Sequence, residues 1–391
     1  MSAARARDSG SSTMLRTITV TAKPIRAAPH SSATSPEVRK FAPPLTIESI
    51  NRREIEDTTN AVDTEDAVKY LPSLFLRKRD YGDTQATLQT RTWGVNSSAR
   101  SLVYVDDVPI SALISNNNTT GAPRWGMVSP AQVAGIDMLY GPFAAEYPGN
   151  SMGGVLLITT RMPTKFAATV EQTEALQSFD LYRTHRSYRT SNTTATVGDH
   201  VGSFSWFLSF NREDSDGQPL YFITSGSLPA GVAGAIPARN KTGATADVVG
   251  AGGIQHAILD NITGKFALDL TDWLRATYSL GYFDNQTTAT DQSYLTTAAG
   301  SRTFGGVSGF ANDNYRWREQ HLMNALSLKT DTRGVWDWEA IATRYDYLGD
   351  IQRSPAGVLA GDTFKPNGYL GRLDGTGWST EDLKGIWRPG G

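Results

Sequence analysis

The second half of the chain alternates between apolar and polar residues with a period of two. From Phe204 to Phe210 every second residue is large and apolar, and serine stands at positions 205 and 209 between them. The same alternation runs through residues 265–282 and 321–347. Successive side chains of a β-strand point to opposite faces, so this period predicts strands with one apolar and one polar face.

These strands are predicted to form hairpins. Residues 265–270 and 274–282 flank Thr271-Asp272, and residues 321–330 and 335–347 flank residues 331–334. The arms are about 10 residues or longer, which is enough to span a bilayer when tilted. A further short turn is expected at 197–200. The short turns alternate with long polar connections at about 213–258, 284–318 and 349–376. This pattern is typical of an outer-membrane β-barrel, while a soluble β-sandwich, with strands of roughly 5–6 residues, stays open as the alternative.

The first half has mixed signals that predict a compact α+β domain. Asp63 and Thr64 can cap a short helix that ends near Tyr70, because Pro72 disfavours helical geometry at the residue before it. Residues 129–132 have the form of a capping box with proline at the first helical position. Four apolar runs bounded by turn residues predict strands at 74–76, 102–105, 136–140 and 155–158.

Residues 1–44 are rich in Ser, Thr, Pro and Arg and are predicted to form a flexible tail. One segment differs, because residues 17–21 are all β-branched and favour an extended conformation. The predicted division is therefore a tail at 1–44, an α+β domain at 45–163 and a β-strand region at 164–391.

Composition excludes several functions. The chain has no cysteine and a formal net charge of -2, so neither thiolate chemistry nor nucleic-acid binding is expected. The five histidines show no metal-ligand spacing, and neither a nucleophile elbow nor a phosphate-binding loop occurs. Asp106 and Asp107 are expected in a turn, where aspartate forms local hydrogen bonds. We expect no enzyme, no metal and no cofactor.

A glycine-rich segment at 136–160 resembles the last motif of the plug domain of TonB-dependent outer-membrane receptors. The residues that carry this resemblance are Gly141, Pro142, Tyr147, Gly149, Gly153 and Gly154, followed by the apolar run 155–160. Residues 66–76, 91–94 and 102–109 resemble earlier plug segments in the same order. The sequence departs from the family pattern at Ser73, at Thr92-Trp93, at Asp107 and at Tyr140, which stands where an arginine is common.

The resemblance implies a plug followed by antiparallel strands of a transmembrane β-barrel in the cell outer membrane, surrounded by outer-membrane lipid. Barrels of this family have about 22 strands, and we count about eight, so the barrel is expected to be incomplete and the chain a truncated gene product or an incomplete sequence. A signal peptide is not recognised after Met1.

The resemblance also implies partners. The extended segment resembles a TonB box, which would add as a strand to a TonB-type periplasmic energy-transducing protein; its residues are Thr17, Ile18, Thr19, Val20, Thr21 and Ala22. Three apical plug loops would contact a small-molecule chelate such as an iron–siderophore complex, and the candidate ligand contacts are Arg77, Arg79, Tyr81, Asn96, Asn117 and Trp125.

The function that this resemblance implies is energy-coupled uptake of such a ligand. Two alternatives stay open at this point. The plug could act alone as a periplasmic ligand-binding or signalling module, or the chain could be a non-functional truncated product.

Overall fold

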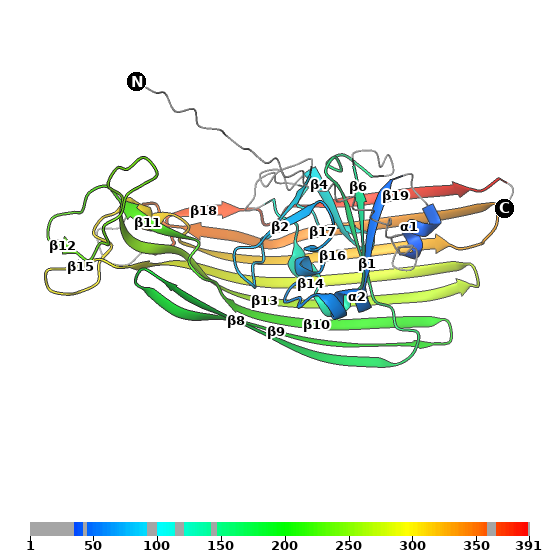
Figure 1. The fold of residues 1–391 in the computed structure, drawn as a ribbon. Helices are drawn as coiled ribbons and strands as arrows, with labels where there is room; N and C mark the ends of the chain where they lie inside the picture. Colours follow the sequence, from blue (N-terminus) through cyan, green and yellow to red (C-terminus); the bar gives the residue numbers. More distant parts are fainter. Residues whose placement is uncertain are drawn as a thin grey trace, which may run out of the picture.

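The computed structural model describes residues 35–41, 45–91, 100–113, 121–141, 147–357 and 365–389. A small α+β part comes first in the chain and packs against a large antiparallel sheet formed by the rest (Figure 1). No helix within these residues is long and apolar enough to cross a membrane. The TonB-box residues 17–22, Asn96, Asn117 and Pro142 lie outside the described residues.

The small part is built on a five-stranded sheet with the order β1-β6-β7-β4-β5. Its strands are β1 (Thr46–Asn51), β4 (Ser101–Val105), β5 (Val108–Pro109), β6 (Val133–Tyr140) and β7 (Gly154–Thr160). Only β4 and β7 are parallel. A separate hairpin pairs β2 (Leu74–Arg77) with β3 (Thr87–Thr90). The helices of this part are α1 (Pro36–Phe41), α2 (Arg52–Thr58) and the 3-10 helices η2 (Thr64–Val68), η4 (Trp125–Met127) and η5 (Pro130–Gln132).

The four strands predicted for this part are confirmed, and the helix after Asp63 is found as η2. Asp63 caps it in a capping box: the Asp63 side chain accepts from the backbone N–H of Asp66, and the Asp66 side chain accepts from the backbone N–H of Asp63. The capping box predicted at 129–132 is wrong, because the Ser129 side chain makes no cap hydrogen bond. The Gln132 amide instead donates to Asn261 Oδ1 at 2.9 Å, so contact with the large sheet replaces the local bond.

The predicted tail is too long, because α1 lies within it. Val38 is buried against Leu102, Leu139 and Val155. Lys40 Nζ donates to Thr330 O at 2.6 Å. A helix of 6 residues with a single buried apolar residue has no periodicity that the sequence could reveal.

The second part is a ten-stranded antiparallel sheet in which β8 forms one edge and β18 and β19 share the other. It is not closed. Its strands are β8 (Ala167–Leu181), β9 (Thr184–Val201), β10 (Phe204–Asp216), β11 (Tyr221–Ser225), β13 (Asp247–Thr271), β14 (Leu274–Ser293), β16 (Tyr315–Thr330), β17 (Trp336–Ser354), β18 (Tyr369–Arg372) and β19 (Gly377–Trp387). The long connections contain the short pair β12 (Val232–Ala233) and β15 (Thr296–Thr297) and the 3-10 helix η6 (Ser308–Ala311).

Both predicted hairpins are confirmed, as the pairs β13–β14 and β16–β17. The turn expected at 197–200 is wrong, since these residues continue β9 and the chain turns at Gly202, where φ is +63°. The strands also extend well into the predicted long connections. β13, for example, begins at Asp247 and has 25 residues.

The face of the sheet that points away from the small part carries an apolar band. Phe210, Ile262, Tyr282 and Leu322 are successive neighbours across four strands in this band. Ile262 is 55% exposed and Leu326 is 53% exposed. Toward the long connections the same face becomes charged, with Arg212 and Asp260 2.7 Å apart and Arg318 and Asp284 3.4 Å apart.

The opposite face is polar where it covers the small part. Asn192, Asn211, Asn261 and Asn285, on four neighbouring strands, are all buried there. One hydrophobic cluster joins residues of both parts, including Val68 and Trp125 from the small part and Phe283 and Tyr345 from the sheet. The sheet therefore buries a largely polar face and exposes an apolar band, the reverse of a sheet that faces water.

Candidate functional site

The glycine motif lets β7 enter the small sheet between β4 and β6. Gly154 has φ of +130°, and a Cβ there would lie 2.7 Å from Leu139 O. A Cβ on Gly153 would lie 2.3 Å from Ser101 Oγ, while the Gly153 amide donates to Arg100 O at 2.8 Å. Backbone conformation and close approach both require glycine at this point. Gly141 also has a positive φ, of +103°.

The other motif residues behave differently. Tyr147 packs its ring 5.7 Å from that of Tyr104. A structural role for Gly149 is not supported, because a Cβ there would meet nothing within 4 Å. The neighbouring Asn150 takes the positive φ, at +73°, and asparagine tolerates this conformation well.

Two departures from the family pattern keep the local structure. Ser73 replaces a glycine and has φ of +58°; at Asp107, the other replacement of a glycine, the positive φ belongs to the preceding Asp106, at +52°. Tyr140, in the usual place of an arginine, donates its hydroxyl to Pro72 O. Tyr140 therefore joins β6 to the turn before β2 through a hydrogen bond and not through an ion pair.

A cavity of about 470 Å³ lies between the β2–β3 loop and the long-connection end of the large sheet. Residues of both parts line it, among them Arg77, Arg79, Gln85, Gln218, Gln255 and Tyr315. The predicted ligand contacts Arg77 and Arg79 thus lie at one cavity. Tyr81 belongs to the same loop and is 47% exposed.

Trp125 is not a candidate ligand contact, which corrects the prediction from the sequence. Its side chain is 2% exposed, and its indole Nε1 donates to Ala86 O at 2.8 Å. Trp125 is a core residue that anchors η4 beneath the β2–β3 loop. An aromatic residue in a loop region gives the same sequence signal whether it faces a ligand or the core.

Arg79 is held in place by Asp83. The two side chains form an ion pair with two hydrogen bonds, one of them 2.9 Å from Nε to Oδ2. Burial tends to raise the pKa of Asp83, but the charge and hydrogen bonds of Arg79 outweigh it and lower that pKa. Arg77 is exposed and has no ion-pair partner among the described residues. Arg77 is therefore the cation of this cavity that is available to an anionic ligand.

Three buried polar atoms at the cavity have no hydrogen-bond partner among the described residues. They are Gln85 Nε2, Thr87 Oγ1 and Gln218 Oε1. Buried polar groups are nearly always satisfied by protein, water or ligand. This cavity therefore offers both donors and acceptors to a polar molecule.

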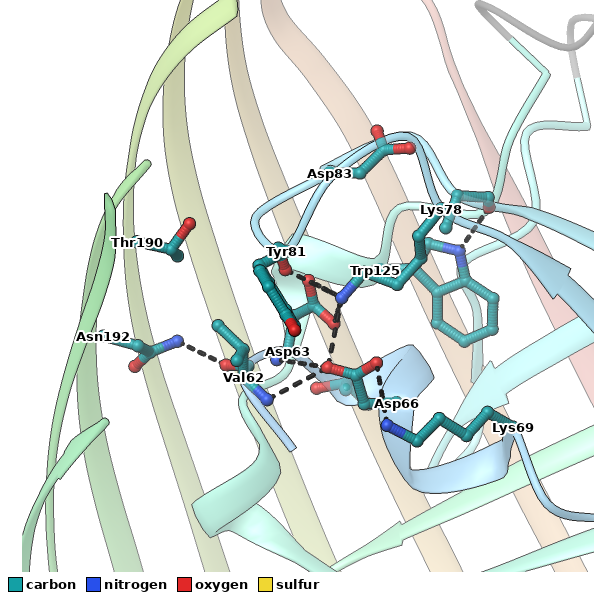
Figure 2. A network of polar contacts seen from close by, with 12 residues as sticks. Val62, Asp63, Asp66, Lys69, Lys78, Tyr81, Asp83, Trp125, Thr190 and Asn192 are labelled. Atoms are coloured by element: carbon teal, nitrogen blue, oxygen red, sulfur yellow. Dashed lines mark hydrogen bonds and ion pairs between the residues drawn. The ribbon is translucent and has the colours of Figure 1, made fainter. Parts of the chain in front are cut away.

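Lys78 also lines the cavity, but its ammonium group lies in a buried acidic cluster (Figure 2). Its Nζ donates to Asp63 Oδ1 at 2.5 Å, to Asp66 Oδ2 at 3.1 Å and to Tyr81 O at 2.8 Å. Burial favours the neutral amine, but the neighbouring carboxylates outweigh it and raise the pKa of Lys78. Lys78 thus fastens the cavity loop to η2.

Glu65 is the unpaired member of this cluster. It is 0% exposed, and neither carboxylate oxygen has a hydrogen-bond partner among the described residues. Burial raises its pKa to about 8, with Asp66 and Asp83 adding to the shift and Lys78 opposing it. A small cavity of about 20 Å³ adjoins it, also lined by Glu213 and Asn192 of the large sheet, and this is enough room for one water molecule.

Polar contacts also join the two parts at the opposite end, near the short turns. Asp106 lies 3.0 Å from Lys265 Nζ, and Asp107 lies 2.6 Å from Lys329 Nζ. The two aspartates do form the predicted turn, but the sequence analysis did not predict their ion pairs with lysines of the large sheet. Lys265 and Lys329 occupy the polar face of predicted strands, and that position was the only signal in the sequence.

Comparisons with known proteins agree with this architecture. The family model described as TonB-dependent Receptor Plug Domain matches residues 39–155. Among solved structures, the ferric enterobactin receptor PfeA from Pseudomonas aeruginosa, a R480A mutant in complex with enterobactin, is similar at 14% identity and a TM-score of 0.55, covering 87% of this chain and 46% of that chain. The siderophore receptor PirA from Acinetobacter baumannii is similar at 15% identity and a TM-score of 0.53, covering 88% and 44%. No curated protein sequence matches.

The chain spans less than half the length of these solved structures. At such low identity the likeness shows the fold, and the family match shows a receptor domain and not an enzyme, as expected from the sequence. The family match shows a TonB-dependent receptor plug domain at residues 39–155, and the likeness to the solved structures shows that antiparallel strands of the barrel fold follow it.

Proposed function

We propose that the chain is part of an outer-membrane receptor that binds a ferric chelate of the siderophore class over its plug for energy-coupled uptake. The observation that carries this proposal is the 470 Å³ cavity at the β2–β3 loop, with Arg77 exposed and three unsatisfied polar atoms around it. The similarity to siderophore receptors supports the ligand class.

The apolar band supports the outer membrane as the location. The nine residues of β14 from Leu274 to Tyr282 extend over roughly 30 Å at the usual rise per residue of a β-strand. This length is close to the height of the lipid-facing band of such barrels, which is about 25 Å. The charged pairs Arg212–Asp260 and Arg318–Asp284 then lie at the edge of the bilayer. Lipid is the solvent that suits this face.

Energy coupling is proposed through residues 17–22, which precede the plug and would pair as an extended strand with a TonB-type periplasmic protein. We also propose a division into tail, plug and barrel strands in which the plug includes α1, from Pro36, and ends at residue 163. Import needs a closed barrel, which the described strands do not form, so the tests on this chain measure binding and not transport.

The alternative of a plug that acts alone is less well supported. Phe283, Met323 and Tyr345 of the large sheet belong to the same hydrophobic cluster as the plug core. Removing the sheet would expose that cluster and would leave Asp106 and Asp107 without their lysine partners. A plug that evolved to act alone would be expected to have a polar surface there.

Ligand binding can be tested on the full chain refolded in detergent, by quenching of tryptophan fluorescence with a ferric tris-catecholate and a ferric tris-hydroxamate complex. Arg77→Glu should weaken binding of the anionic tris-catecholate by at least about tenfold, because it reverses the free charge at the cavity. Arg53→Glu is the matched control, since Arg53 is 90% exposed on α2 and away from the cavity.

Failure of both complexes to bind would contradict the proposal. Equal weakening by the two substitutions would also contradict it, because the effect would then depend on net charge and not on the cavity.

A further inference from the structure

A second polar site lies on the inner face of the large sheet. Glu319 and His321 are two residues apart on β16, and Asp350 pairs with Glu319 on β17 beside a bulge. All three side chains are buried, with His321 0% exposed. One potential ligand atom from each lies within 4.8 Å of the others.

Each of these three side chains is oriented by a hydrogen bond to its other polar atom. Trp317 Nε1 donates to Asp350 Oδ1 at 2.6 Å, and Asn285 Nδ2 donates to Glu319 Oε2 at 2.7 Å. His321 Nδ1 lies 3.1 Å from the Tyr345 hydroxyl. Metal ligands in proteins are commonly fixed in this way by a second shell of donors and acceptors.

The atoms that face one another at the centre are unsatisfied. Asp350 Oδ2 and His321 Nε2 have no hydrogen-bond partner among the described residues, and they lie 3.4 Å apart. Two ligands of a tetrahedral zinc ion, each about 2.0–2.1 Å from the metal, are separated by about 3.3 Å. The spacing of the free atoms therefore fits a shared metal ion.

The charge of the site also leaves room for a cation. Arg124 of the plug is the neighbouring guanidinium, 3.7 Å from both Glu319 Oε1 and Asp350 Oδ2, which is longer than a hydrogen bond. Its Nε donates to the Tyr347 hydroxyl at 3.2 Å. With both carboxylates ionised, the single guanidinium balances one of the two negative charges.

We propose that Glu319, His321 and Asp350 form a binding site for a divalent first-row metal ion of the Zn²⁺ class. One imidazole and two carboxylates are ligands that suit such ions. The site is separate from the ligand cavity and does not depend on the proposed function. Because Arg124 lies beside it, metal binding and plug contact compete for the same carboxylates.

The test is a titration of the full chain in detergent with Co²⁺, whose visible absorption reports coordination, followed by competition with Zn²⁺. One ion is expected to bind per chain. His321→Gln and Asp350→Asn should each weaken binding by at least about 100-fold, and Trp317→Phe, which removes only the indole donor, by roughly 10- to 100-fold. Arg124→Gln should strengthen binding by about tenfold, which a merely structural role would not produce.

His256→Gln is the matched control, because His256 is exposed and lies 3.1 Å from Asp216 on the outer face. Near-UV circular dichroism checks that each variant folds, and the Trp317→Phe and Arg124→Gln results decide the matter if His321→Gln does not fold. The proposal is overturned if no ion binds at millimolar Co²⁺, if His256→Gln abolishes binding, or if Arg124→Gln and Trp317→Phe both leave the affinity unchanged.

Discussion

At the scale of single residues, Glu65 is a carboxylate buried in the plug. Its carboxylate is 0% exposed and has no hydrogen-bond partner among the described residues, and its pKa is raised to about 8. The folded state therefore holds a proton that the unfolded chain releases near pH 4.5. This stabilisation is complete below about pH 4.5 and is lost as pH rises through about 8.

The first prediction follows from this decrease of stability with rising pH. Glu65→Gln should make the free energy of unfolding less dependent on pH and should stabilise the protein at pH 9 relative to wild type, by on the order of 3 kcal/mol, with little difference at pH 5. Urea unfolding of both proteins in detergent at the two pH values measures it. An equal difference at both pH values would show that Glu65 does not titrate in this range.

Gly154 gives the second prediction. Gly154→Ala should destabilise the plug by roughly 2–4 kcal/mol, because its φ of +130° and the 2.7 Å approach to Leu139 O leave no room for a Cβ. Gly149→Ala is the matched control and should be nearly neutral, since nothing lies within 4 Å of its Cβ position. Thermal unfolding followed by near-UV circular dichroism compares the two; similar losses of stability would contradict the role given to Gly154.

At the scale of elements, strands were predicted from the sequence wherever apolar and polar residues alternate along the chain. Phe204–Phe210 and Leu274–Tyr282 stand in the apolar band, so their two faces differ in polarity. Beyond the band both faces are polar, as at Arg212 and Glu213, and the alternation disappears although the strand continues. This is why residues 213–216, the end of β10, were predicted to belong to a connection.

Contacts between elements could not be predicted in this way. The cluster of Lys78 with Asp63 depends on how the β2–β3 loop folds over η2. The pairing of Glu319 with Asp350 depends on the register of two strands whose residues are far apart in sequence. A single sequence shows which residues are polar, but the register decides which of them meet.

The third prediction concerns β16 as a lipid-facing strand. Leu326→Arg should lower stability in lipid vesicles by roughly 2–4 kcal/mol, because it places a charge within the apolar band. Leu370→Arg on β18 should have little effect, since Leu370 is similarly exposed, at 52%, but lies beyond the charged pairs that end the band. Urea unfolding in vesicles separates the two; if both substitutions are neutral, the band does not face lipid.

At the scale of the whole molecule, plug and sheet form one structure. They share a hydrophobic cluster, and ion pairs join them near the short turns. The sheet has unpaired edges at β8 and at β18 and β19, and the chain spans less than half of its structural relatives. We therefore expect the plug and the covered strands to unfold together, while the edge strands open first.

A spin-label scan of β16 from residue 322 to residue 328 in lipid vesicles shows directly which face of the sheet contacts lipid. The chain has no cysteine, so each introduced cysteine is the only labelling site. Labels at Leu322, Leu326 and Leu328 should collide with dissolved oxygen and not with a water-soluble nickel complex, while labels at Met323, Ala325 and Ser327 should be shielded from both. Collisions of the outward labels with the nickel complex, or no alternation at all, would contradict a sheet that faces lipid on one side and the plug on the other.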